Sequence, residues 1–275
     1  MVITLLSDFE DVYPASMKGV ILGINPTASI VDISHSVRRH DIHAGAFILM
    51  SCAKFFPPGT VHIAVVDPGV GTERRPLAIR AESPDAGIQY FIGPDNGLLI
   101  PAAKSIGSFE AYSITNVALF RKNVSGTFHG RDVFAPVGAH ISKGLDIGNV
   151  GMRIFDFVEL DFGKVEKKDD SLHGQVVFID HFGNIVTNIP ADTAADIKPG
   201  DVLEIRKKRV LFQTSYGFCE KGETVALIGS HGYLEIAVNQ GNAAALFDMG
   251  QGDRIVIKIQ GKRLSGPKQT ATNNC

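Results

Sequence analysis

The sequence lacks several features that would point to particular classes of protein. It has no tryptophan, an aromatic content of 8% and a net charge of -2, so it indicates neither the basic groove nor the stacking surface of a nucleic-acid-binding protein. Its three cysteines, Cys52, Cys219 and Cys275, are widely spaced, which argues against a disulfide framework and against a zinc knuckle. We therefore expect reduced thiols, no nucleic-acid partner, and a small or zwitterionic ligand.

Signals for a membrane or for export are missing as well. No charged segment precedes an apolar one at the N-terminus, and no apolar run reaches membrane-spanning length. With 275 residues, of which 44% are hydrophobic, the chain can bury a substantial core and is long enough for two domains. We expect a soluble cytoplasmic protein without a membrane partner.

The most informative stretch is VHIAVVDPGVGTERRP, residues 61–76. Its apolar block is typical of a strand buried on both faces, and the Pro-Gly turn ends that strand just after Asp67. Ligands of α/β proteins bind outside the carboxyl ends of the strands, so Asp67 occupies a position expected for a site. Arg74 and Arg75 could hold this carboxylate ionised and oriented. For the segment alone, an aspartate that caps its own turn is the commoner interpretation.

The first half of the chain alternates strand and helix patterns, which indicates an α/β domain with a mainly parallel central sheet. Strand patterns end next to Asp8 and Asp67, so both carboxylates should lie at the same edge of that sheet. Asp41 is placed to cap a helix. The predicted strands are 3–6, 29–33, 61–66, 77–81 and 90–92, and the helical patterns cover 17–24, 42–53 and 133–141.

The segment TFHGRD, residues 127–132, precedes the last of these helical patterns. His129 should therefore lie near a helix N-terminus, where the helix dipole disfavours the imidazolium ion and lowers the histidine pKa. For an isolated histidine, a loop residue that bonds to the backbone is the commoner interpretation.

The second half of the chain has a different pattern: short strand patterns follow one another without a long helix between them. This predicts a smaller antiparallel β domain, either a sandwich or a small barrel-like structure. The charge-mixed segment 164–172 predicts a linker, which gives domains 1–163 and 173–262, and the polar tail 263–275 is predicted to be disordered. The predicted strands are 176–180, 184–189, 202–205, 210–212, 225–228, 233–236 and 255–259.

Two turn clusters in this half carry polar groups, DHFGN at 180–184 and GSHGY at 229–233. Taken singly, aspartate, asparagine and glycine occur in turns for backbone reasons. Phe182, which stands between polar residues, hints at a stacking surface.

Motifs along nearly the whole chain resemble the adenosine-forming S-adenosyl-L-methionine (SAM) hydrolases, whose superfamily includes the fluorinase and chlorinase enzymes. The motifs are long and occur in order, which makes chance similarity an unsatisfactory explanation. They are SDF at 7–9, MKGVI at 17–21, VDISH at 31–35, FFPPGTVHIAVVDPGVGTERRP at 55–76, GPDNGLL at 93–99, TFHGRD at 127–132, FGNIVTNI at 182–189 and GYLEIAVNQG at 232–241.

The resemblance implies that Asp67, Arg74 and His129 act together on a water molecule. This water attacks the ribose C5′ of SAM and releases methionine and adenosine, without a cofactor or a metal ion. The residue types suit such a reaction, because methionine leaves as a neutral thioether and only the nucleophile needs a proton acceptor.

The resemblance also implies substrate contacts and an assembly. Family members have an α/β N-terminal and a β C-terminal domain and form homotrimers with the sites between neighbouring subunits. The matching substrate-binding positions are Asp8 for the ribose hydroxyls, Phe182 and Asn184 around the adenine, Asp180 near the methionine amino group, Ser230 near its carboxylate, and Glu235 and Val238 beside the adenosine.

The sequence departs from the family pattern at three places. Phe9 runs directly into Glu10 and Asp11, which implies a tighter ribose loop. His181 and His231 stand where arginine and a small residue are common, so the methionine end of the site can differ.

Three other functions compete with hydrolysis. A halogenase carries out the same displacement with a halide ion, but the carboxylate of Asp67 would repel that anion. A SAM or adenosine sensor would bind without turnover, which the intact set of three residues disfavours. A metallohydrolase would need histidines and acids at ligand spacing, and no such pattern is present.

Overall fold

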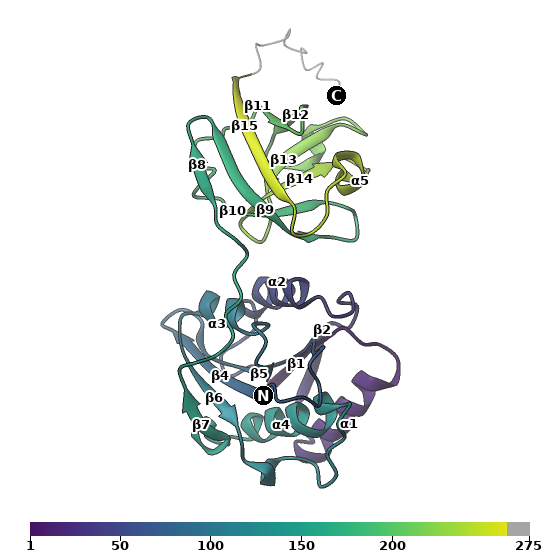
Figure 1. Ribbon diagram of the computed structural model, residues 1–275, viewed down its shortest axis with the longest axis vertical. Coiled ribbons are helices and arrows are strands. Elements are labelled where there is room, and N and C mark those ends of the chain that lie inside the picture. Colours follow the sequence, from purple (N-terminus) through teal and green to yellow (C-terminus); the bar gives the residue numbers. More distant parts are fainter. Residues whose placement is uncertain (263–275) are drawn as a thin grey trace, which may run out of the picture. The chain divides into compact units, whose positions relative to one another are not determined.

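The computed structural model describes residues 1–262, so the tail predicted to be disordered, 263–275, lies outside the described residues. The chain forms two compact units, one from Met1 to Asp161 and one from Phe162 onward (Figure 1). Both units match the predicted classes, an α/β unit followed by a β unit. None of the helices in the described part combines the length and hydropathy needed to cross a membrane.

A seven-stranded sheet forms the centre of the first unit, in the order β2-β1-β3-β5-β4-β6-β7. Strands β2, β1, β3 and β5 run parallel, as predicted, and β4, β6 and β7 extend the sheet by antiparallel pairing. The strands are β1 Val2–Ser7, β2 Ser29–Ser34, β3 Val61–Val65, β4 Pro76–Ser83, β5 Gly87–Pro94, β6 Ser108–Ile114 and β7 Gly151–Ile154.

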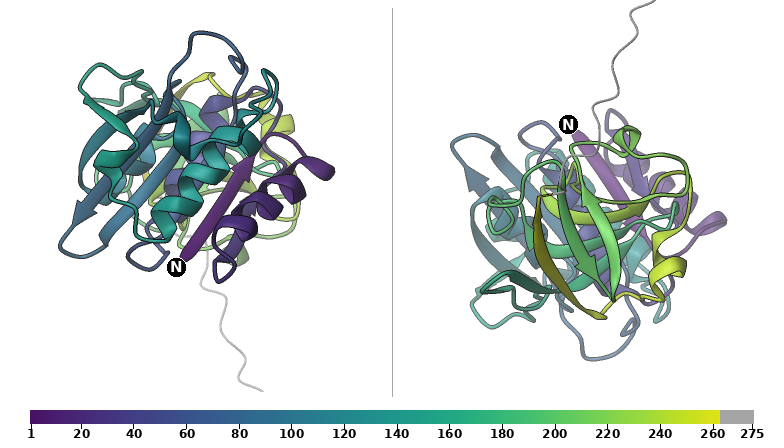
Figure 2. Two further views of the ribbon diagram at one scale, coloured as in Figure 1. Left: turned by 90° about the horizontal axis from the view of Figure 1, so that it is seen from below. Right: turned by 90° about the horizontal axis from the view of Figure 1, so that it is seen from above.

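Helices cover both faces of this sheet. The pair α1 (Val12–Ile24) and α4 (Ala135–Ser142) packs on one face, and the pair α2 (Ile42–Ala53) and α3 (Ile100–Ile106) packs on the other (Figures 1 and 2). Asp41 caps α2 as predicted, because its Oδ1 accepts the Ala44 N–H at 2.9 Å. A π-helical turn, Gly130–Phe134, leads directly into α4, and short 3-10 turns occur at Val117–Leu119 and Ile147–Asn149.

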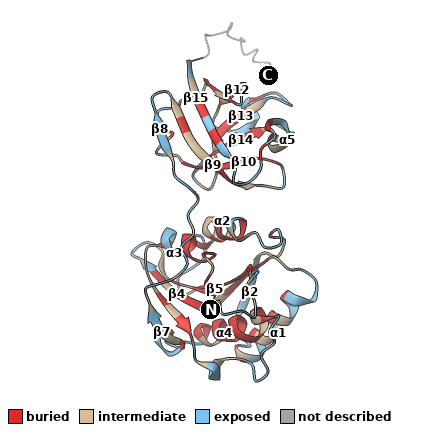
Figure 3. Ribbon diagram, in the orientation of Figure 1, coloured by how far each residue is buried: buried red, intermediate tan, exposed pale blue. Residues whose placement is uncertain are grey.

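The core of the first unit lies along β3, which is buried over its whole length. Figure 3 shows the buried residues on the central strands and on the helices that cover them. His62 is the polar exception in this strand, and it is bonded on both sides: Nδ1 lies 2.7 Å from Thr4 Oγ1 on β1, and Nε2 lies 2.8 Å from Gln89 Oε1 on β5. The buried histidine thus joins three neighbouring strands through side-chain hydrogen bonds.

The second unit is a closed β-barrel, as the short strand patterns allow. Its strands follow the order β10-β14-β13-β12-β11-β15-β9, and pairing of β10 with β9 closes the ring (Figure 2, right). One pair, β12 with β13, is parallel and the other pairs are antiparallel. The elements are β9 Ser171–Ile179, β10 Ile185–Pro190, β11 Asp201–Ile205, β12 Lys208–Phe212, the 3-10 turn Tyr216–Phe218, β13 Thr224–Ile228, β14 Tyr233–Val238, the short helix α5 Ala243–Phe247, and β15 Arg254–Lys262.

The segment predicted as a linker, residues 164–172, folds differently. It forms β8 (Glu166–Lys168), which pairs antiparallel with the start of β9 through a turn that holds Asp169 at φ 45°. Every residue of β8 is exposed, so its sequence carries no hydrophobic alternation by which a strand could be recognised. Charged residues of this kind are common on edge strands. The units divide between Asp161 and Phe162.

Candidate active site

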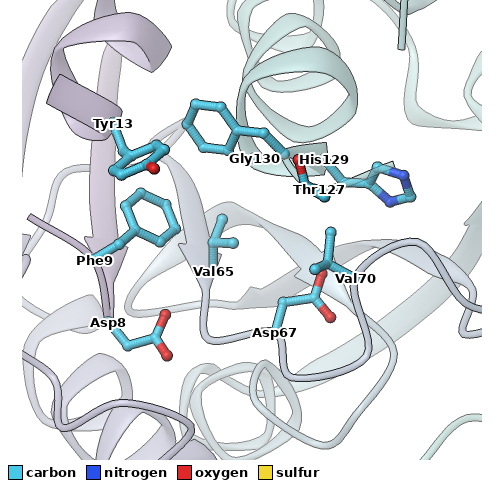
Figure 4. A pocket seen from close by; sticks show the side chains of 10 residues that line it. Asp8, Phe9, Tyr13, Val65, Asp67, Val70, Thr127, His129 and Gly130 are labelled. Atoms are coloured by element: carbon cyan, nitrogen blue, oxygen red, sulfur yellow. The ribbon is translucent and has the colours of Figure 1, made fainter. Parts of the chain in front are cut away.

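The ends of two parallel strands bring Asp8 and Asp67 to one edge of the sheet. In the pairing of β1 with β3, Ser7 stands opposite Val65, so Asp8 and Asp67 follow at nearly the same level. They line a pocket of about 260 Å³ with residues from the loop before the π-helical turn (Figure 4). The lining residues are Asp8, Phe9, Tyr13, Val65, Asp67, Val70, Thr127, Phe128, His129 and Gly130.

Arg74 connects Asp67 to His129. Its Nε lies 2.9 Å from Asp67 Oδ1, and its Nη2 donates to Asp67 Oδ2. The same Nη2 lies 3.0 Å from His129 Nδ1. The side chains of Asp67 and Arg74 are 5% and 11% exposed, so the ion pair is largely shielded from water. The structure therefore brings all three predicted catalytic residues into one contiguous group.

A close approach of two loops makes this contact possible. Gly71 has φ 77°, and a Cβ built on it would stand 2.2 Å from the carbonyl oxygen of Gly126. Only glycine fits both the positive φ and this distance. The loop that carries Asp67 and Arg74 can therefore lie directly against the loop that carries His129.

The hydrogen bonds fix the protonation state of His129. An arginine nitrogen can only donate, so His129 Nδ1 accepts the bond from Arg74, and the ring is neutral with its proton on Nε2. The pKa of His129 is lowered from 6.5, first by burial and then by the Arg74 charge, against the opposing charges of Asp67 and Asp132. The predicted direction is correct, but burial and Arg74 are the causes, in place of a helix terminus.

A second feature of Arg74 concerns its remaining nitrogen. Nη1 is buried and has no hydrogen-bond partner within residues 1–262, while the guanidinium lies over the ring of Phe134 with Cζ 5.2 Å from its centroid. A buried donor of this kind is costly unless something accepts from it. It is available to a water molecule or a ligand oxygen.

Three aromatic side chains form the opposite wall of the pocket. Phe9, Tyr13 and Phe128 meet edge to face, with centroid distances of 5.8, 5.6 and 5.2 Å. Figure 4 shows Phe9 and Tyr13 on one side of the pocket and Asp67 and His129 on the other. Sequence reasoning did not assign these aromatic residues to the site, although Phe9 and Phe128 stand within the SDF and TFHGRD motifs.

The loop after β1 is short, as its sequence implies. Helix α1 begins at Val12, and Asp11 just before it has φ 60° and ψ -125°, a conformation that non-glycine residues rarely adopt. Asp8 ties this loop to the next one, because its Oδ2 accepts the His40 N–H at 2.8 Å. A carboxylate has about four acceptor positions, so Asp8 can still accept from a ligand.

In the second unit, Asp180 organises its own turn. Its Oδ1 accepts the N–H groups of Phe182 and Asn184 at 2.9 and 2.8 Å, and its Oδ2 accepts Asn184 Nδ2 at 2.9 Å. Phe182 is 64% exposed at the tip of this turn, and its ring centroid lies 3.8 Å from that of His181. Four of the predicted residues, Val238 among them, share a pocket of about 660 Å³ lined by Asp180, Phe182, Asn184, Tyr216, Val238, Asn239, Gln240, Gly241 and Asn242.

Glu235 is buried and bonded at both oxygens. Tyr216 donates to its Oε1 at 2.5 Å, and His231 Nε2 lies 3.2 Å from its Oε2. The pKa of Tyr216 is raised by burial and then by this bond to Glu235. Tyr216 lines the pocket but was not predicted, because a lone tyrosine in a loop carries no motif signal. Ser230 is exposed on the turn between β13 and β14.

The part of the chain that the structure describes holds no group of three or more His, Cys, Asp or Glu side chains that could bind a metal ion. The hydrogen bonds of Arg74 leave Asp67 able to act as a proton acceptor and His129 as a positioned hydrogen-bond donor.

Comparisons with known proteins cover both units. Residues 3–151 match the family model described as SAM hydroxide adenosyltransferase N-terminal domain, and residues 174–256 match the model of the C-terminal domain. An (R)-S-adenosyl-L-methionine hydrolase from Methanocaldococcus jannaschii is 38% identical over 271 residues, which is 93% of this chain and 95% of that protein.

A second relative and a solved structure are also similar to nearly the whole chain. A fluorinase from Nocardia brasiliensis is 30% identical, with coverage of 94% of this chain and 97% of that enzyme. The crystal structure of an uncharacterised conserved protein from Thermotoga maritima superposes with a TM-score of 0.86 at 37% identity, covering 94% of this chain and all of that chain.

Proposed function

The chain belongs to the SAM hydroxide adenosyltransferase family, and from that premise we propose that it hydrolyses S-adenosyl-L-methionine to adenosine and L-methionine. The observation that carries this proposal is the contact of Asp67 and His129 with one arginine at the wall of a pocket. Relatives of similar length that are named as (R)-S-adenosyl-L-methionine hydrolases support the same reaction.

The three residues have different roles in activating and orienting the attacking water. Asp67 is an anion whose orientation is fixed by Arg74, so it can accept a proton from water. His129 accepts from Arg74 through Nδ1 and keeps a proton on Nε2, so it can donate a hydrogen bond to the water oxygen. One group takes the proton while the other fixes the direction of the lone pair that attacks.

The leaving group explains why the site needs no acid. Attack on C5′ displaces methionine from a sulfonium, and a neutral thioether leaves with the bonding electron pair. Positioning then supplies much of the rate, because reacting atoms about 3 to 3.5 Å apart and aligned can gain several orders of magnitude. The aromatic wall of Phe9, Tyr13 and Phe128 offers a surface for the sulfonium, since cations are attracted to aromatic faces.

The substrate contacts that we propose are those that the family resemblance implies. We propose that Asp8 accepts from the ribose hydroxyls. In the second unit, we propose that Phe182, Asn184, Glu235 and Val238 surround the adenosine, and that Asp180 and Ser230 bind the methionine amino and carboxylate groups.

Assembly and location belong to the same proposal. We propose a cytoplasmic homotrimer in which each site receives residues from two subunits, and a reaction that needs no cofactor. Light scattering of the purified protein measures the assembly: a mass of three chains supports it, and a stable monomer with full activity contradicts it.

The similarity to a fluorinase suggests halogenation as an alternative to hydrolysis. It would require a halide ion beside Asp67, whose carboxylate is 5% exposed. Two like charges about 4 Å apart repel by about 4 kcal/mol at an effective dielectric of about 20. This electrostatic cost favours a neutral water molecule as the nucleophile.

Incubation with SAM in ¹⁸O-labelled water tests the proposal. We expect equal amounts of adenosine and methionine, with the label in the adenosine 5′-hydroxyl and no effect of a chelator. The same incubation with chloride or fluoride should give no 5′-halo-adenosine. Asp67→Ala and His129→Ala should keep SAM binding and lose most turnover. Tight binding without products would identify a sensor, and wild-type turnover in both variants would refute the assigned roles.

A further inference from the structure

A chain of polar side chains leads away from the candidate active site beneath the loop that carries Asp8. Ser7 Oγ lies 2.9 Å from the carbonyl oxygen of Phe9 and 2.7 Å from His35 Nδ1. His35 Nε2 lies 3.1 Å from Asp32 Oδ1. Lys18 on α1 donates to Asp32 Oδ2 at 2.6 Å. None of these four side chains belongs to the proposed reaction.

Counting protons along this chain shows what state it requires. The Phe9 carbonyl can only accept, so the single hydroxyl proton of Ser7 satisfies it only if His35 Nδ1 donates to Ser7. His35 Nε2 lies near Asp32 Oδ1 but makes no hydrogen bond within residues 1–262. The two hydrogen bonds of Ser7 therefore require a proton on His35 Nδ1, which makes the ring the donor and the Ser7 hydroxyl the acceptor.

Charged groups surround the network. Burial acts to raise the pKa of Asp32, but interactions with Lys18 and His35 outweigh it and lower that pKa. The groups that face His35 therefore include one anion in direct contact. The other charged or titratable residues around it, which line a pocket of about 530 Å³ with His35, are Asp8, Glu10, Asp11, Tyr13, Arg38, Arg39 and His40.

The geometry does not make Ser7 a second nucleophile, although serine, histidine and aspartate stand in sequence as in a hydrolytic triad. Ser7 is 1% exposed, and its hydroxyl already has a carbonyl acceptor in Phe9. A nucleophile must instead reach its substrate. The arrangement suits a positioning role.

We propose that Ser7, His35, Asp32 and Lys18 form a positioning network that holds the Phe9 backbone, and with it Asp8, in the conformation that binds substrate. Its kinetic consequence rests on the proposed function: KM for SAM rises when a hydrogen bond of the network is removed, while kcat stays unchanged.

The barrel supplies a matched control. Ser171 Oγ donates to the Lys168 carbonyl at 2.9 Å and lies 2.9 Å from His173 Nε2, so it repeats the serine, carbonyl and histidine arrangement at the β8–β9 turn. Ser171→Ala removes the same number of hydrogen bonds as Ser7→Ala. Any effect of losing a serine in general is common to both variants.

Steady-state kinetics is the first test. We expect Ser7→Ala to raise KM roughly 3- to 10-fold, the effect of one ordinary hydrogen bond, with kcat within twofold, and Ser171→Ala to match the wild type. Equal KM values in the two serine variants would overturn the proposal.

Nuclear magnetic resonance tests the network without relying on turnover. The ¹³C′ signal of Phe9 should shift in Ser7→Ala, which removes the hydroxyl donor of this carbonyl, and should stay in place in Ser171→Ala. If Ser7→Ala does not fold, His35→Ala serves instead, because it removes the ring that bonds to Ser7 and should shift the same signal. A Phe9 signal that does not differ from the wild type in these variants would refute the network, even if SAM hydrolysis itself failed to be observed.

Discussion

Replacing Arg74 by lysine separates the charge of this residue from its shape. The guanidinium bonds to both oxygens of Asp67 and also to His129 Nδ1. Lysine keeps the positive charge, but its single ammonium cannot reproduce the rigid fork of donors. At least one of the charge-assisted bonds must be lost.

The size of the effect follows from that loss. A hydrogen bond to a charged group contributes about 1.5 to 3 kcal/mol. Each 1.36 kcal/mol is a factor of about ten in rate, so kcat of Arg74→Lys should fall about 10- to 150-fold. KM should change less, because Arg74 acts on Asp67 and His129 and is not itself proposed to contact SAM. Adenosine release measured by chromatography over a range of SAM concentrations gives both constants.

Arg75→Lys is the control for this substitution. Arg75 is the next residue and makes a similar fork, with Nε and Nη2 at 3.0 and 2.8 Å from Asp95 Oδ2, but it does not bond to Asp67 or His129 in the described structure. Its kcat should remain near the wild-type value. If Arg74→Lys also kept kcat within threefold of wild type, the fork would not position the catalytic pair, and the mechanism would be wrong.

Three further predictions concern pH and loop order. His129 must be neutral to accept from Arg74 and its pKa lies below 6.5, so the acid limb of kcat should have a midpoint below pH 6.5; a midpoint above that value would contradict the assignment. Burial lowers the pKa of His62 from 6.5 to about 4. The free energy of unfolding should therefore keep its full value above about pH 6.5 and decrease by roughly 3 kcal/mol as the pH falls towards 4. Urea unfolding at several pH values should show a smaller decrease of this free energy for His62→Gln. Asp132 is fully buried and bonds to Arg131 and to the Ser125 N–H, so it should hold the loop that carries His129. Asp132→Asn should therefore lower Tm and reduce kcat about tenfold. Unchanged kinetics would show that the loop adopts its conformation without Asp132.

The fold was predictable where a local pattern and a buried face coincide. Strand β3 was recognised because it is apolar at every position except His62, and α2 because Asp41 caps its first turn. Helix α3 was missed because it has only seven residues, with Pro101 in its first turn, too few for a helical period. Strand β8 was missed because all of its residues are exposed.

The site was predictable only in part. Asp67 and Arg74 lie in one loop, so their contact could be inferred from spacing, whereas His129 is 55 residues further along the chain from Arg74. Its place in the group came from the family resemblance. The contact itself depends on the close approach of Gly71 to Gly126, which no periodic pattern records. Hydrogen bonds between distant side chains, such as Ser7 to His35, likewise leave no local signal.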